Sequence, residues 1–214
     1  MSVVDLTQSQ RVEQRLVNQA LRDLRRLYNA MDLTDGVRAR EALIEILKDL
    51  TLIYGEAVAT VAMETFMRMR EKAGIKGTYT PVLAPPPPDA QIDSSVRWAV
   101  DTLFGDKFDK KATLTKLEGI TARLVLQQGR ETTAKNVTRK GSGAYAFARI
   151  LGPGEDNCEF CVMLSSRGAV YRSFDSASAA FHDNCRCSVV PAFEGQEVAG
   201  YDPEALYQKY KNSR

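Results

Sequence analysis

Every cysteine and the only histidine of this 214-residue chain stand in two short clusters. The first cluster has the spacing Cys-x2-Cys, and the second, twenty residues further on, has the spacing His-x2-Cys-x-Cys. A tight Cys-x2-Cys turn aims two thiolates at one point, which is typical of a structural zinc site. The candidate metal ligands are therefore Cys158, Cys161, His182, Cys185 and Cys187.

Zinc takes four ligands in a structural site, so one of these five residues does not bind the ion directly. The sequence does not say which one it is. The part of the chain that carries the clusters is short and has few large apolar residues. A small module of this kind gains folding free energy from a bound metal, which favours zinc as a structural cofactor.

Three other uses of the two clusters stay open. Two disulfides would suit an exported domain, but the N-terminal segment lacks the apolar stretch of a signal peptide. Four buried free cysteines around a core histidine would need no ion. A catalytic site would pair a cysteine with His182, or place Ser165 or Ser166 beside it. Clustered thiolates and the lack of an H-E-x-x-H pattern favour a structural site, so no catalytic residue is assigned and an enzyme is not expected.

The first third of the chain has the periodicity of helices. Apolar residues recur at steps of three and four, which places them on one side of a helix: Val12, Leu16, Ala20, Leu24, Leu27 and Met31. Turn residues at 32–36 end this helix, and a second one is predicted over 37–72. The apolar stripe of the second helix is wide, so we expect other helices or another subunit to cover more than one of its sides.

The organisation of the chain follows from these patterns. Residues 1–74 are predicted to form a helical hairpin, and residues 75–92 a proline-rich extended linker that acts as a rigid spacer. Residues 93–140 are predicted to be helical and basic, and residues 141–191 form the Cys/His module. Residues 192–214 are a tail.

The predicted fold class is therefore mainly α. A body of long helices precedes a small α+β C-terminal module that a metal stabilises. The second helical part contains a helix over 110–138, and the single tryptophan, Trp98, is predicted to be a packing anchor. The C-terminal tail contains a short helix that begins near residue 202.

Positive charge is concentrated between residues 107 and 140, where nine basic residues face three acids. Such a segment is either a solvated helix face or a surface for phosphate or an acidic partner. The candidate nucleic-acid contacts are Lys135, Arg139 and Lys140, which would bind packaged DNA without sequence preference.

Residues 144–191 resemble the C-terminal motif of phage Mu F-like minor head proteins, in the version carried by tailed phages of actinobacteria. The resemblance is carried by Cys-Glu-Phe-Cys-Val-Met-Leu-Ser-Ser-Arg-Gly at 158–168, Val-Tyr at 170–171 and Phe-His-Asp-Asn-Cys-Arg-Cys at 181–187. In many family members a proline stands where this chain has Asp183. The motif positions carried over are the five candidate ligands named above.

This resemblance implies a minor structural and assembly protein of a tailed-phage head. The implied partners are the portal, the scaffold or the major capsid protein, and further copies of the chain itself are candidates. The implied location is the head interior or the portal vertex of the virion, and the host cytoplasm during assembly. No apolar run approaches the roughly 20 residues of a membrane span, so no membrane is involved. A capsid maturation protease is the first alternative, and a zinc-containing nucleic-acid-binding module is the second.

Overall fold

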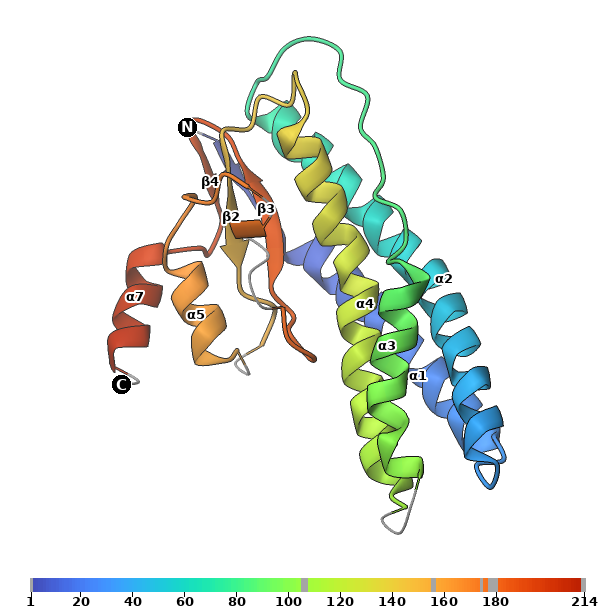
Figure 1. Cartoon of the computed structure of the whole chain (residues 1–214). Helices are drawn as coiled ribbons and strands as arrows, with labels where there is room; N and C mark the ends of the chain where they lie inside the picture. The colour runs from blue at the N-terminus through green and yellow to red at the C-terminus, as the bar shows by residue number, and fades with distance from the viewer. Residues whose placement is uncertain (1, 105–107, 155–156, 174, 177–180, 213–214) are drawn as a thin grey trace.

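The computed structural model describes residues 2–104, 108–154, 157–173, 175–176 and 181–212. Long helices form a bundle, and a smaller part built from short strands and short helices packs against one side of it (Figure 1). The predicted mainly α fold with an α+β C-terminal module is confirmed. Within the described ranges, no helix combines the length and the apolar composition that crossing a membrane requires.

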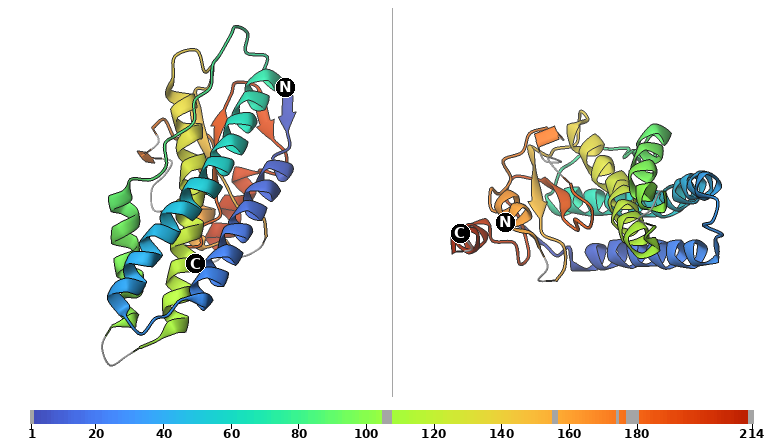
Figure 2. Two further views of the ribbon diagram at one scale, coloured as in Figure 1. Left: turned by 90° about the vertical axis from the view of Figure 1, so that its right-hand side faces the viewer. Right: turned by 60° about the horizontal axis from the view of Figure 1, so that its bottom comes forward.

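Four helices make up the bundle. They are α1 (Thr7–Ala30), α2 (Gly36–Lys72), α3 (Asp89–Ala99) and α4 (Lys110–Thr138), and a 3-10 turn at Val100–Leu103 follows α3. The helix predicted over 110–138 is confirmed. Figure 2 shows α1 running along both α2 and α4, which explains why α2 is apolar on more than one side.

The start of α2 is fixed by its capping residue. The Asp35 carboxylate accepts hydrogen bonds from the backbone amides of Val37 and Arg38, each 3.1 Å long. These amides have no partner within the helix, so an aspartate at this position satisfies them and favours helix initiation. The turn predicted at residues 32–36 is thereby confirmed.

Two glycines allow α2 and α4 to approach each other closely. A Cβ on Gly129 of α4 would lie 2.7 Å from Val58 Cγ1 of α2, and a Cβ on Gly55 of α2 would lie 2.5 Å from Gln128 Oε1 of α4. Contacts as short as these leave no room for a methyl group. The pair of glycines therefore sets the closest distance between the two longest helices.

The proline-rich segment lies along α4 instead of holding two helical parts apart. Asn136 of α4 accepts a hydrogen bond from the Val82 amide (3.0 Å) and donates one to the Val82 carbonyl (2.7 Å). Thr132 Oγ1 accepts from the Ala84 amide, and Gln128 donates to the Ala84 carbonyl, both at 2.9 Å. Because prolines cannot supply a regular pattern of backbone donors, polar side chains of α4 satisfy the neighbouring backbone groups.

The prediction of a rigid spacer was therefore wrong. The predicted extended linker at 75–92 is also too long, because α3 already begins at Asp89, directly after the last proline. Pro88 precedes the first helical residue, where a proline needs no hydrogen-bond partner for its nitrogen.

Two small sheets form the strand-containing part. Strand β2 (Ala146–Ile150) pairs antiparallel with β3 (Ser188–Ala192) across the Cys/His module. Strand β1 (Ser2–Val4), at the N-terminus, pairs in parallel with β4 (Gln196–Val198). The first residues of the chain therefore join its C-terminal part, which the sequence did not predict because a three-residue strand has no measurable periodicity.

Two short helices complete this part. Helix α5 (Glu159–Ser165) follows the first cysteine cluster, and α7 (Pro203–Asn212) lies in the predicted tail. The short helix expected near residue 202 is confirmed. The described part of the predicted tail thus contains the last residue of β3, strand β4 and helix α7.

The longest helices contribute to several buried apolar clusters, of which two are the largest. One buried apolar cluster lies inside the bundle, and a second one lies between the bundle and the sheets. The second cluster contains residues of α2 and α4 together with strand residues: Phe66, Met69, Ala134, Val137, Phe147 and Val190. The strand-containing part is therefore packed on the helices that also build the bundle.

Trp98 is not a packing anchor. Its side chain is 56% exposed, and the ammonium nitrogen of Lys116 lies 4.8 Å from the centre of its ring. The last turns of α3 leave this ring on the outer face of the bundle, where a cation covers it.

We predict that Asn136→Ala lowers the free energy of unfolding by about 2–3 kcal/mol, because it leaves both backbone groups of Val82 without their partner. Asn136 is fully buried. Urea denaturation followed by circular dichroism measures the change. Asn18→Ala, on the exposed side of α1, is the matched control and should change stability by less than about 0.5 kcal/mol. Equal effects of the two substitutions would contradict the role given to Asn136.

Candidate metal centre

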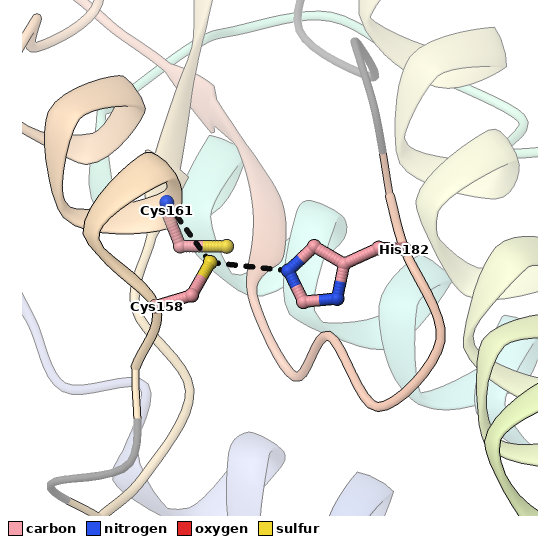
Figure 3. Close-up of side chains that lie close together, drawn as sticks. All are labelled: Cys158, Cys161 and His182. Atoms are coloured by element: carbon pink, nitrogen blue, oxygen red, sulfur yellow. Dashed lines mark hydrogen bonds between the residues drawn. The ribbon is translucent and has the colours of Figure 1, made fainter.

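The first cysteine pair is positioned by the start of α5. Cys158 is the N-cap residue, and its Sγ accepts a hydrogen bond from the backbone amide of Cys161 at 3.3 Å. One helical turn therefore brings the two sulfur atoms to the same side (Figure 3). Cys158 is exposed and Cys161 is buried, so the pair spans the boundary between solvent and interior.

The second cluster begins with a tight turn. The Cys185 amide donates to the His182 carbonyl at 3.1 Å, and Asn184 adopts a φ of 65° to close the turn. Asparagine tolerates this left-handed conformation better than most residues. Each cluster thus contains a four-residue turn with a candidate ligand at both ends.

The geometry fixes which ring nitrogen of His182 is available. Nδ1 lies 2.7 Å from the Asp183 carbonyl oxygen, which can only accept, so Nδ1 carries the proton. Nε2 then faces the Cys158 sulfur at 3.1 Å (Figure 3). A histidine that donates its other nitrogen to a carbonyl is held in the orientation that metal ligands need.

All five predicted ligands come together. The ligand atoms of Cys158, Cys161 and His182 lie within 4.8 Å of one another, and so do those of Cys161, Cys185 and Cys187. Cys161 belongs to both groups, and its sulfur is 3.6 Å from that of Cys185. A tetrahedral zinc site with bonds of about 2.3 Å separates its sulfurs by about 3.8 Å. The distance between the Cys161 and Cys185 sulfurs is therefore that of two ligands of one zinc ion.

The disulfide alternative is not what the structure contains. All four cysteines are free. The distance of 3.6 Å between the sulfurs of Cys161 and Cys185 is far longer than a disulfide bond of about 2.05 Å. The histidine is exposed at the surface, so the alternative of a core histidine is also wrong.

Two arginines lie against the cysteines. Arg149 of β2 is fully buried, and its Nη2 lies 3.8 Å from the sulfur of Cys161 and 3.9 Å from that of Cys185. Arg130 of α4 donates to the carbonyl oxygens of Cys185 and Cys187 at 2.8–3.1 Å. Buried cations beside sulfur atoms stabilise the charged thiolate form, which is the form that binds metal.

The aromatic ring of Phe181 holds the two arginines in place. The guanidinium carbon of Arg130 lies 3.7 Å from its centre, and that of Arg149 lies 4.3 Å away. Burial lowers the pKa of Arg130 to about 10, which leaves the side chain charged at neutral pH. The sequence did not indicate that either arginine contacts the candidate ligands. The signal for Arg149 was its position within an otherwise apolar strand, Ala146–Ile150.

The pKa values follow from these contacts. Burial acts to raise the pKa of Cys158, but hydrogen bonds from His182 and from the Cys161 amide outweigh it and leave this pKa below its ordinary value. The bond to the Asp183 carbonyl and the bond to Cys158 raise the pKa of His182. Hydrogen bonds with Cys161 and Cys187 lower the pKa of Cys185, whereas that of Cys161 is raised by its bonds to Cys185 and Cys187.

Residues 181–187, which we call the ligand loop, are seated on α4. Asp183 forms an ion pair with Arg123 at 2.7 Å, and Arg123 also reaches Ser95 of α3. A Cβ on Gly119 would lie 2.9 Å from Cβ of Asp183, so only glycine lets the loop approach this closely. Because Gly119, Arg123 and Arg130 share one face of α4, the helix and the loop are fixed to each other.

The basic residues of segment 107–140 do not form one surface. Arg130 is buried and Arg123 is paired with Asp183, while Lys107 lies outside the described residues. The three candidate nucleic-acid contacts, Lys135, Arg139 and Lys140, are exposed near the end of α4. Their role stays a prediction.

The serine alternatives for catalysis do not match the geometry. Ser165 is fully buried, and the Ser166 hydroxyl donates to the Met163 carbonyl at 2.8 Å. The two nitrogens of His182 face Cys158 and a backbone carbonyl.

A family model described as VG15 protein matches residues 1–213. The chain belongs to the VG15 protein family. Membership in this family, which spans nearly the whole chain, supports a phage protein. No curated protein and no solved structure gives a match.

In this VG15 protein, Glu13 connects α1 to the Cys/His module. The carboxylate accepts a hydrogen bond from the Ser188 hydroxyl at 3.2 Å. It lines a cavity of about 30 Å³ together with Arg130 and Cys187. Burial raises the pKa of Glu13 to about 7, although Ser188 and Arg130 act in the opposite direction.

This raised pKa predicts a pH dependence of stability. The folded protein holds a proton on Glu13 that the unfolded chain releases above its ordinary pKa of 4.5. The stabilisation is therefore complete below pH 4.5 and is lost as the pH rises through about 7. Glu13→Gln keeps a neutral side chain at every pH. We expect the free energy of unfolding of this variant, relative to that of the wild type, to increase by about 1–3 kcal/mol from pH 5 to pH 8.

Urea denaturation at pH 5 and at pH 8, at constant ionic strength, tests this prediction. Glu64→Gln, on the exposed side of α2, is the control and should follow the wild type at both pH values. If Glu13→Gln and wild type lose the same stability between the two pH values, the carboxyl is not the cause.

Proposed function

We propose that this VG15 protein is a minor structural and assembly protein of a tailed-phage head. In this proposal it associates with the portal and the procapsid, and one structural zinc ion stabilises its Cys/His module. The observation that carries the proposal is the convergence of four thiols and one imidazole beside two buried arginines. The resemblance of residues 144–191 to Mu F-like minor head proteins supplies the role in the head.

A structural role for zinc is supported by how the ligands are held. Three of the four cysteines are buried. An ion pair and hydrogen bonds from the Arg130 side chain to backbone carbonyls fix the ligand loop to α4. Sites rich in thiolates that are closed by protein favour structural zinc, whereas catalytic zinc keeps a position open for water. When bound, the ion would link α5, the ligand loop and, through Arg130, helix α4.

The bundle offers contact surface for a partner. Ile53 of α2 is 62% exposed and its neighbour Leu52 is 49% exposed. These side chains lie on the outer side of the longest helix, where no other described element covers them. In the proposed function this side of α2 meets the portal, the scaffold, the major capsid protein or a second copy of the chain.

Elemental analysis of protein purified under reducing conditions tests the metal. We expect one equivalent of zinc. Removal of zinc with a chelator should lower the melting temperature by on the order of 10 °C, because metal binding free energy is folding free energy in such modules. Intact disulfides together with no metal would contradict the proposed centre.

Copurification tests the role in the head. Tagged protein expressed with the portal and procapsid proteins of the same phage should copurify with one of them. The paired substitution Leu52→Glu with Ile53→Lys should abolish this association and leave the melting temperature nearly unchanged. Arg38→Glu, at another exposed position of α2, is the control for a change of charge alone. A monomer that binds none of these proteins would contradict the assignment.

One observation favours a second candidate, a capsid maturation protease with a cysteine nucleophile. Cys158 is exposed at the start of a helix, its pKa is lowered, and His182 Nε2 is 3.1 Å from its sulfur. Such a pair is the arrangement of a thiol nucleophile and its base. If this candidate is correct, Cys158→Ser abolishes cleavage of the major capsid protein while the fold survives. If the site is purely structural, neither the wild type nor Cys158→Ser cleaves the major capsid protein.

A further inference from the structure

We infer that Cys158, Cys161, His182 and Cys185 hold the ion, and that Cys187 stands outside this set as a buried thiol on the interior side of the centre. The inference rests on the proposed zinc site and names the ligands within it. It follows from whether each candidate ligand lies beside the other cysteine cluster or beside the interior cavity.

The two four-residue turns contribute two ligands each. In the first turn, the Cys158 sulfur accepts from the Cys161 amide, so both sulfurs lie over the start of α5. In the second turn, the Cys185 amide donates to the His182 carbonyl, which brings Cys185 back towards the imidazole. The two turns together thus supply four ligands, which is the number that a structural zinc ion takes.

Contacts across the two turns bring the same four residues together. The Cys158 sulfur is 3.1 Å from His182 Nε2, and the Cys161 sulfur is 3.6 Å from that of Cys185. Cys161 completes the arrangement, since its sulfur also lies within 4.8 Å of both Cys158 and His182. Each turn thus contacts the other turn through both of its ligands.

Arg149 contacts two of the sulfurs in this set. Its Nη2 lies at nearly equal distances, 3.8 Å and 3.9 Å, from Cys161 and Cys185. Three thiolates around a divalent cation leave one net negative charge, and a fully buried guanidinium beside two of them offsets it. Arg149 is therefore a positioning residue that supports the ligands without binding the ion.

Cys187 faces the opposite direction. It lies next to β3 and lines the interior cavity together with Glu13, Arg130 and Val58, whereas none of the four assigned ligands lines that cavity. Its sulfur and that of Cys185 both lie within 4.8 Å of the Cys161 sulfur, so the cavity, and not the distance to Cys161, distinguishes the two residues. Cys187 is thus the spare member of the five.

Zinc content and cobalt spectra of matched variants test the assignment. We expect Cys187→Ala to keep one equivalent of zinc and to give the cobalt absorption of three thiolates and one imidazole. Cys185→Ala and His182→Ala should each weaken zinc binding by at least about tenfold, measured by competition with a chromophoric chelator. His182 is exposed, so its replacement should leave the fold of the loaded protein intact.

The outcomes separate the ligand assignment from the proposed function. Wild-type protein without zinc would overturn the zinc centre itself. Wild-type protein with one equivalent of zinc, combined with loss of zinc in Cys187→Ala or full retention in His182→Ala, would overturn only the ligand assignment. If Cys187→Ala does not fold, the cobalt spectrum of the wild type decides, because a centre with four thiolates has stronger sulfur-to-metal absorption than one with three.

Discussion

The seating of the ligand loop on α4 is the interaction on which the rest of the structure depends. Arg130 donates to two carbonyls of the loop, and Arg123, about two helical turns earlier, pairs with Asp183. A buried guanidinium is costly unless its donors are used, so α4 and the loop stabilise each other only in this arrangement. The cysteines are brought together because the helix fixes the loop that carries them.

The long helices also position segments of the chain that lie outside the Cys/His module. Asn136 and Thr132 hold the proline-rich segment along α4, and α2 continues past the bundle to pack under the sheets. Strand β1 then joins β4, so the N-terminus lies beside the C-terminal strands (Figure 1). A metal bound in the Cys/His module would therefore stabilise contacts across much of the molecule.

Predictions from the sequence were correct for elements whose own residues show a recognisable pattern. The helix over 110–138 and the long helix near 37–72 were predicted because apolar residues repeat along them and turn residues end them. The five candidate ligands were identified from spacing alone. The arginines were not identified, since nothing local distinguishes a buried Arg130 from the exposed lysines around it.

The sequence alone determined which residues have the chemistry to bind a metal and which segments are helical, because both are properties of short stretches of chain. Only the tertiary structure decided that the prolines line a helix, that Trp98 is exposed and that Cys187 faces inward. Each of these depends on a contact between residues far apart in the chain. The helix that packs against the ligand loop decides whether a cysteine lies beside a histidine or beside a cavity. The spacing of the cysteines in the sequence does not predict which helix that is.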